Sequence, residues 1–307
     1  MNKQFLVALV ALVLVFGGFV YVLQNENKSS ELTDGRIQVS ASFYPMYFFT
    51  KEIGGDFVTV TNITPAGTEP HDYDPSTQDI ATISGSKILV LNGTVEVWGE
   101  KVAKLVEGTG VGVVVAGEGL QKFSTLEEGV RINDPHIWLD PILAKVEVDR
   151  IAQALILVDP INAVSYQENR EALLHRLESL HQKYTLGLST CSSRDIITAH
   201  SAFAYVASRY NLKQVSISGL SPEQEPSAQE LAAVANFAKA NNVHYIFFES
   251  LVSPKLADTI AKEVGAKTLV LNPLEGITDE EAAAGSTYFS IMEENLKNLQ
   301  IALQCQM

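Results

Sequence analysis

Four residues of this chain have side chains that commonly bind transition metals: His71, His136, His200 and Glu275. Their separations along the chain are 65, 64 and 75 residues, which is far too wide for a local motif. They can act together only if a two-lobed fold brings four loops to one cleft. The sequence therefore predicts a single metal site between two lobes.

The first two candidates lie in turn-rich segments that contain proline. His71 belongs to segment 64–75, which follows a short apolar run and has a proline directly before the histidine. His136 belongs to segment 133–141, where a proline again precedes the histidine. Prolines of this kind fix an irregular path of the backbone, which suits a loop that presents a ligand.

The other two candidates follow apolar runs that are expected to be strands. The run 195–199 leads directly into His200, and the run 268–271 is followed by a turn that contains Glu275. In open α/β sheets, ligands bind beyond the carboxyl ends of the strands. Both side chains are expected at such ends.

The donor types favour zinc, because nitrogen and oxygen donors in a tetrahedron satisfy its filled d-shell. Manganese prefers more oxygen donors and a higher coordination number. Asn272 and Glu249 are alternatives to Glu275 as the fourth ligand. Asp72, Asp74 and Asp140 are close enough in sequence to orient imidazole N–H groups, and Asn272 is a further candidate for supporting the ligands.

Two series of strands and helices must position these loops. Short β-branched or aromatic runs bounded by Gly, Pro or Asn are typical of buried parallel strands, and they occur at 37–43, 58–63, 88–91, 111–116, 195–199, 214–217, 245–249 and 268–271. Helical patterns alternate with them, which indicates α/β lobes with mostly parallel four-stranded sheets.

The middle of the chain has helical periodicity instead. Apolar residues recur at helical spacing over 141–158, and Asp159-Pro160 starts a second pattern that runs to about residue 186. About 27 residues of helix would span roughly 40 Å, enough to run along both lobes. We expect lobes at 36–141 and 188–307, joined by the helices of 142–187 in a rigid connection.

The N-terminal segment favours export. An apolar, uncharged run at 5–23 follows Lys3 and is close to the length that crosses a bilayer. It lacks an A-x-A cleavage pattern, so an uncleaved signal anchor is favoured over a cleaved signal peptide. Residues 1–35 are thus expected to form an anchor and a polar tether, with the rest of the chain exported.

Charge and cysteine content narrow the function further. The formal net charge of −14 makes a nucleic-acid partner improbable. Cys191 and Cys305 are the two cysteines, and an exported protein permits a disulfide between them that would clip the C-terminal helix onto the second lobe. The alternative is two unrelated small buried residues.

Several motifs together resemble the metal-binding proteins of bacterial zinc and manganese ABC importers, in their zinc-uptake branch. The similarity runs from about residue 37 to residue 305 and is carried by the segments around His71, His136 and His200, by 219–227, and by 272–276. The resemblance implies two α/β lobes joined by a long rigid helix, with the metal between them. It also implies docking on a membrane permease.

Carried over residue by residue, the resemblance makes His71, His136 and His200 the three histidine ligands. Manganese-preferring relatives usually have a glutamate where His200 stands, so this position favours zinc. Many relatives use an aspartate in the last loop, where this chain has Asn272. Some zinc-binding relatives use a glutamate three positions later, which matches Glu275.

Two departures from the family pattern concern accessory features. The His-rich acidic loop of several zinc-binding members is absent between Trp98 and His136, so chelation by an auxiliary loop is not expected. The cysteine that would carry a lipid anchor is missing after the apolar run, which agrees with a retained anchor.

The sequence thus predicts a monomeric extracytoplasmic receptor that captures Zn²⁺ and delivers it to the permease of an ABC importer. A manganese receptor of the same family is the first alternative, and an adhesin with a structural metal is another. A zinc hydrolase is less favoured, because catalytic zinc keeps an open position for water that four protein donors would fill. No enzyme activity is expected.

Overall fold

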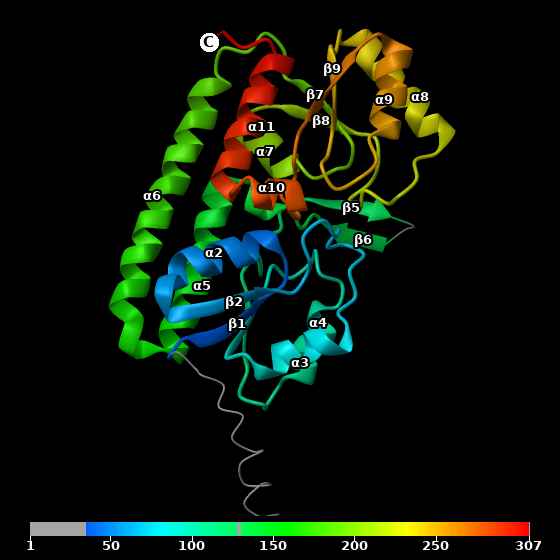
Figure 1. The fold of residues 1–307 in the computed structure, drawn as a ribbon. Coiled ribbons are helices and arrows are strands. Elements are labelled where there is room, and N and C mark those ends of the chain that lie inside the picture. Colours follow the sequence, from blue (N-terminus) through cyan, green and yellow to red (C-terminus); the bar gives the residue numbers. More distant parts are fainter. Residues whose placement is uncertain (1–34, 128–129, 307) are drawn as a thin grey trace, which may run out of the picture. The chain divides into compact units, whose positions relative to one another are not determined.

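Two four-stranded parallel sheets organise the chain (Figure 1). The computed structural model describes residues 35–127 and 130–306. The expected signal anchor and almost all of the expected tether lie in residues 1–34, outside this part. No helix within the described ranges is both long and apolar enough to span a bilayer.

The first sheet has the strand order β2-β1-β3-β4, with β1 (Ile37–Ala41), β2 (Val58–Asn62), β3 (Ile88–Leu91) and β4 (Gly112–Val115). All neighbouring strands are parallel, and Ile37 lies opposite Val58. The strand β3 is buried along its whole length, as expected for a central strand covered on both faces. The helices of the first lobe are α2 (Tyr44–Gly54), α3 (Thr77–Gly85) and α4 (Gly99–Leu105), and η1 (Gly55–Phe57) is a short 3₁₀ turn.

The second sheet has the order β10-β9-β7-β8, with β7 (Asp195–Thr198), β8 (Lys213–Ser216), β9 (Tyr245–Phe248) and β10 (Lys267–Val270). In chain order both sheets therefore run second, first, third, fourth strand. The helices of this part are α7 (Ala204–Arg209), α8 (Ala228–Ala240), α9 (Lys255–Val264), α10 (Asp279–Ala283) and α11 (Tyr288–Ala302). The two lobes repeat one topology, although no repeat is visible in the sequence.

Two long helices lie between the lobes in sequence. The helix α6 (Ala163–Gly187) runs along both lobes, past α2 of the first and α11 of the second, whereas α5 (Pro141–Val158) runs beside the first sheet (Figure 1). The helix α5 begins at Asp140, whose carboxylate accepts a hydrogen bond from the Ile142 N–H at 2.9 Å. The 3₁₀ turn η3 (Pro160–Asn162) reverses the chain into α6. The helical pattern expected after residue 159 thus begins with a separate turn.

One hydrophobic core continues from the first lobe into the second. It contains Phe43 of the first lobe, Tyr184 of α6, and Leu271 and Tyr288 of the second lobe. Because the lobes share this core, the connecting helices are packed into both. The fold class expected from the sequence, two α/β lobes with mostly parallel sheets, is confirmed.

A small antiparallel hairpin was not expected. Its strands are β5 (Ser124–Glu127) and β6 (Val130–Asn133), and Ser124 pairs with Asn133. The hairpin leads directly into the segment of His136, which continues as the 3₁₀ turn η2 (Ile137–Leu139). It therefore fixes the approach of the chain to the site.

Candidate metal centre

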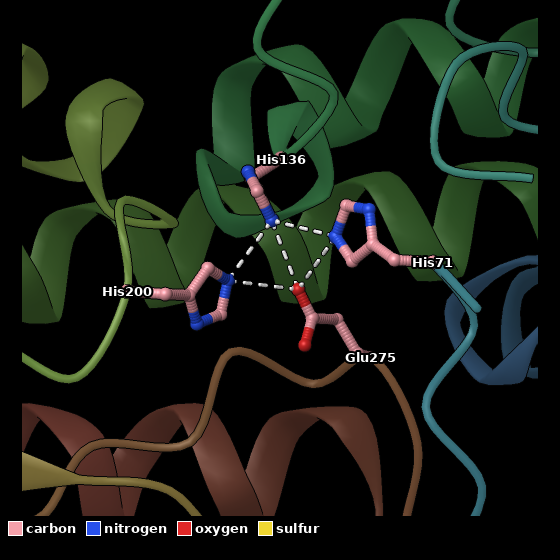
Figure 2. Close-up of side chains that lie close together, drawn as sticks. All are labelled: His71, His136, His200 and Glu275. Carbon is pink, nitrogen blue, oxygen red and sulfur yellow. Dashed lines mark hydrogen bonds and ion pairs between the residues drawn. The ribbon is translucent and has the colours of Figure 1, made fainter. Parts of the chain in front are cut away.

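The structure brings His71, His136, His200 and Glu275 together (Figure 2). One donor atom from each residue lies within 4.8 Å of the other three. The residues come from four separate loops, after β2, after β6, after β7 and after β10. Two of these loops belong to the first lobe and two to the second, so the cluster joins the lobes.

The donor atoms point at one another, as Figure 2 shows. Glu275 Oε1 lies 2.9 Å from His136 Nε2, 3.1 Å from His200 Nε2 and 3.3 Å from His71 Nε2. His136 Nε2 is 3.3 Å from His71 Nε2 and 3.2 Å from His200 Nε2. Donors of a tetrahedral zinc ion, with bonds of about 2.0–2.2 Å, are spaced about 3.3–3.6 Å apart. Five of the six donor separations, 2.9–3.3 Å, are thus at or slightly below this spacing, and all six lie within 4.8 Å.

Burial distinguishes His71 from the other three residues. The His136, His200 and Glu275 side chains are 0%, 0% and 1% exposed, whereas the His71 side chain is 10% exposed. A small ion would therefore reach the cluster from the side of His71.

Two carboxylates hold the imidazoles in orientation. Asp134 Oδ1 lies 2.8 Å from His136 Nδ1 and also accepts the His136 backbone N–H at 3.0 Å. Glu249 Oε1 lies 2.6 Å from His200 Nδ1. A carboxylate acceptor requires Nδ1 to carry the hydrogen, so Nε2 of each ring is left with its lone pair toward the cluster.

The charges of the cluster shift the pKa values of its members. Burial alone would lower the pKa of His200, but the charges of Glu249 and Glu275 and their hydrogen bonds raise it well above its usual value. Burial also opposes protonation of His136, whose pKa is raised by Asp134 and Glu275. Burial raises the pKa of Glu275, but the surrounding histidines outweigh it and hold that pKa well below the usual range. Protons and a cation therefore compete for the same nitrogen atoms.

Glu69 is a functional candidate that the sequence interpretation did not include. Its Oε1 accepts the His71 backbone N–H at 3.2 Å, while Oε2 is buried and has no hydrogen-bond partner among the described residues. Burial and the charge of Glu275 raise the pKa of Glu69 to about 10. Both effects favour the protonated, neutral form of this carboxyl group in the metal-free protein.

A repeated local pattern could have identified both Glu69 and Asp134. Each is an acidic residue followed by a proline and then a ligand candidate, Glu69-Pro-His71 and Asp134-Pro-His136. In both cases the acid accepts the backbone N–H of the histidine two residues later. Only Asp134 also contacts the imidazole ring.

The four side chains named above as possible supports of the ligands have other surroundings, and Asp74 is exposed. Asp72 is exposed. Asp140 caps α5 and forms a salt bridge with Arg209 at 2.7 Å. The amide of Asn272 donates to Ser250 and Glu281, and its oxygen accepts the Leu274 N–H at 2.7 Å. The imidazole orienters are Asp134 and Glu249, which sequence proximity did not single out for this role.

The loop that carries Glu275 is held by its own backbone geometry. Leu274 has a positive φ of 58°, an uncommon conformation for a residue with a branched side chain, and it is completely buried. The Asn272 side chain stabilises this turn through the Leu274 N–H. The turn directs the Glu275 carboxylate into the cluster (Figure 2).

The two cysteines form a disulfide, Cys191–Cys305, at a sequence separation of 114. It joins the segment before β7 to the end of the chain after α11. The disulfide thereby fixes the C-terminal helix to the second lobe. It lies before the start of β7, whereas His200 follows the end of that strand.

Comparison with known proteins gives consistent matches. The chain is 40% identical to the zinc-binding lipoprotein AdcA of Streptococcus pneumoniae over 281 residues, which cover 87% of this chain and 56% of that protein. It is 39% identical to the high-affinity zinc uptake system protein ZnuA of Bacillus subtilis over 288 residues, 90% of each chain. The crystal structure of the Zn(II)-bound ZnuA-like domain of S. pneumoniae AdcA superposes with a TM-score of 0.77 at 40% identity, covering 88% of this chain and 99% of that one.

These relatives differ in length. The chain spans little more than half of the pneumococcal protein but most of the Bacillus protein. A family model described as zinc-uptake complex component A, periplasmic, matches residues 39–302, which include all four clustered residues and both sheets except the first two residues of β1. The chain therefore belongs to the ZnuA family.

Proposed function

We propose that this chain is an extracytoplasmic receptor that captures Zn²⁺ and delivers it to the permease of an ABC importer. The observation that carries the proposal is the convergence of three imidazole nitrogens on one carboxylate oxygen between loops of both lobes. Relatives named for zinc binding and for high-affinity zinc uptake support zinc as the cargo.

In this proposal His71, His136, His200 and Glu275 bind the ion directly. Asp134 and Glu249 keep two of the imidazoles in the tautomer that offers Nε2. Residues 36–141 and 188–307 act as the two lobes, and 142–187 connect them. The chain acts as a monomer, is exported, and stays tethered to the membrane by residues 1–35.

Four protein donors favour transport over catalysis. They fill the coordination of a tetrahedral zinc ion, whereas a catalytic zinc keeps one position for water. The donor set also favours zinc over manganese, because three nitrogen donors leave fewer oxygen ligands than manganese prefers.

Isothermal titration of the chain with Zn²⁺ and with Mn²⁺ tests the cargo. We expect tight zinc binding at one site and weaker manganese binding, with His200→Glu reducing the preference for zinc. Glu275→Ala should weaken zinc binding strongly. Stronger binding of manganese by the unmodified chain would overturn the metal assignment, and unchanged zinc affinity in Glu275→Ala would remove that residue from the site.

Chelation separates a receptor from a protein that needs metal to fold. Both lobes and the connecting helices share a continuous apolar core, which favours a fold that forms without the ion. We expect the far-UV circular dichroism spectrum to persist after zinc is removed. Loss of the helical signal on chelation would instead identify a structural metal.

A further inference from the structure

Exposed apolar side chains gather at one end of the first lobe. Twelve large apolar residues are exposed in the described part of the chain, and half of them lie at this end. We call this group the apolar end: Phe57, Val113, Leu157, Val158, Ile161 and Val164. Exposed apolar side chains that gather on one surface are typical of sites that contact another molecule or a membrane.

The group is centred on the turn between α5 and α6. Leu157, Ile161 and Val164 are 82%, 92% and 66% exposed, so they project from the turn. Val158 packs beside Gly112, the first residue of β4, and the Phe57 ring contacts Tyr166 with ring centroids 6.2 Å apart. The turn, the start of β4 and the η1 segment thus lie together at this end of the lobe.

This surface lies at the amino ends of the strands of the first sheet. Val58 follows Phe57 and pairs with Ile37, the first residue of β1, so the chain enters the lobe at this same end (Figure 1). The sequence before Ile37 has a polar stretch of twelve residues, 24–35, preceded by the apolar run 5–23. Twelve residues reach at most about 40 Å when fully extended.

We propose that the apolar end rests on the lipid bilayer and inserts Leu157, Ile161 and Val164 at the boundary between headgroups and acyl chains. This inference rests on the membrane anchor that forms part of the proposed function. A short tether that leaves from the apolar end keeps this surface close to the bilayer. Because the tether holds the apolar end near the bilayer at a high effective concentration, even a weak insertion of its side chains is populated.

The proposal gives the metal centre a defined orientation. His71 and His136 lie at the opposite end of the lobe, and α5 leads from the His136 segment to the apolar end. Its 18 residues span about 27 Å. While the apolar end is seated on lipid, the metal centre faces away from the membrane and is open to ions outside. For the metal centre to face a permease in the membrane, the two lobes must first leave the lipid surface and rotate.

Fluorescence quenching by lipid tests the contact. The full chain with Ile161→Trp is reconstituted into phosphatidylcholine vesicles, with and without phosphatidylcholine that carries a nitroxide on its acyl chain. Uncharged lipid is chosen because the net charge of −14 would oppose binding to anionic vesicles. The native Trp98 and Trp138 are both buried, so they add the same background in each variant.

The matched control is Leu186→Trp, at the other end of α6, where the side chain is also exposed, at 73%. We expect the nitroxide lipid to quench Ile161→Trp at least about twofold more than Leu186→Trp, since only the former would lie at the acyl-chain boundary. Adding Leu157→Ser and Val164→Ser to Ile161→Trp should remove this difference.

Equal quenching of the two tryptophan variants would overturn the proposal. A blue-shifted Ile161→Trp emission that ignores the nitroxide lipid but grows with protein concentration would assign the surface to a second copy instead. Zinc titration of the same variants is independent of these outcomes. Retained zinc affinity without quenching would reject the membrane contact alone, whereas absent zinc binding in the native chain would reject the receptor.

Discussion

Trp138 donates its indole N–H to the backbone carbonyl oxygen of Pro273 at 2.8 Å. Trp138 is two residues after His136, and Pro273 is two residues before Glu275. The bond therefore ties a loop of the first lobe to a loop of the second, directly behind two members of the cluster. Tyr288 of α11 extends the link by donating its hydroxyl to the Trp138 carbonyl oxygen at 2.6 Å.

Replacing Trp138 with phenylalanine tests whether this link positions the ligands. The ring would still fill the core, but the bond to Pro273 would be lost. A neutral hydrogen bond contributes roughly 0.5–1.5 kcal/mol, so zinc affinity should fall by up to about tenfold. Isothermal titration measures the change.

Trp98→Phe is the matched control. Trp98 is also buried, but its indole N–H has no hydrogen-bond partner among the described residues. Its zinc affinity should be unchanged. If both variants lost affinity equally, a general packing defect rather than the Trp138–Pro273 bond would be responsible.

Glu249→Gln should weaken zinc binding through His200. The carboxylate of Glu249 fixes the His200 ring and makes it more basic, and removal of such a partner typically costs about 10–100-fold in metal affinity. Asp134→Asn should act similarly through His136. The exposed Asp72 supplies the control, since Asp72→Asn should bind zinc normally. Normal affinity in Glu249→Gln would show that the ring is held by other contacts.

Acid should release zinc. The release should begin at a higher pH than it would from histidine ligands with unshifted pKa values. The pKa values of His136 and His200 are raised, so these rings take up protons above their usual value of 6.5. An imidazolium must lose its proton to bind zinc, so affinity falls as pH falls through this range. Zinc titrations at a series of pH values measure it, and an affinity that stays constant down to pH 6.5 would contradict the prediction.

In the metal-free protein, the raised histidine pKa values make folding stability change with pH in the opposite direction to zinc affinity. A raised histidine pKa means that the folded state binds protons more tightly than the unfolded state. The resulting stabilisation is complete below the unfolded pKa of about 6.5 and is lost as pH rises through the folded values. Thermal melts of the metal-free chain should therefore show this loss above neutral pH, where zinc stabilises most.

The strands and the long helices were predictable because each has a strong local signal. All eight expected strands are present with small differences at their ends, since β-branched and aromatic runs between turns are specific to buried strands. The hairpin β5–β6 was missed because its strands lack such a strong local signal. Its segment 124–127 has a single apolar residue, and the two apolar residues of segment 130–133 are separated by Arg131, so neither contains a continuous apolar run.

Long-range partners were less predictable than local ones. Glu249 was considered only as a substitute ligand, because its contact with His200 crosses 49 residues and depends on the pairing of β7 with β9. Asp134 is two residues from His136, and a search for acid-Pro-His patterns would have found it. The common strand order of the two sheets was invisible because it is a property of topology rather than of residue identity.

Removing the disulfide should destabilise the fold without affecting the metal centre. Cys191→Ser combined with Cys305→Ser opens a loop of 114 residues, and loss of such a bridge typically costs about 2–4 kcal/mol. The bridge precedes β7, whereas His200 follows its far end. Tm should fall while zinc affinity is retained. A large loss of affinity would indicate that the second lobe requires the bridge to hold His200.

A buried acid of α5 gives the final prediction. Glu147 is completely buried, and its Oε1 accepts a hydrogen bond from the Asn92 amide at 3.0 Å. Its second carboxyl oxygen and the Asn92 amide oxygen are both buried without a partner in the described part of the chain. Burial raises the pKa of Glu147 to about 8.

Glu147→Gln should therefore become more stable than the native protein as pH rises from 4.5 to about 8. The folded state binds the Glu147 proton more tightly than the unfolded state, so native stability declines by up to about 1.4 kcal/mol per pH unit as pH rises from the unfolded pKa of 4.5 toward 8. Glutamine cannot ionise, so its variant escapes this decline, and its added N–H can bond the Asn92 oxygen. Denaturant unfolding of the two proteins should give similar free energies near pH 4.5 and a growing advantage for the variant up to pH 8. A difference that does not change with pH would mean that Glu147 keeps the same charge throughout this range.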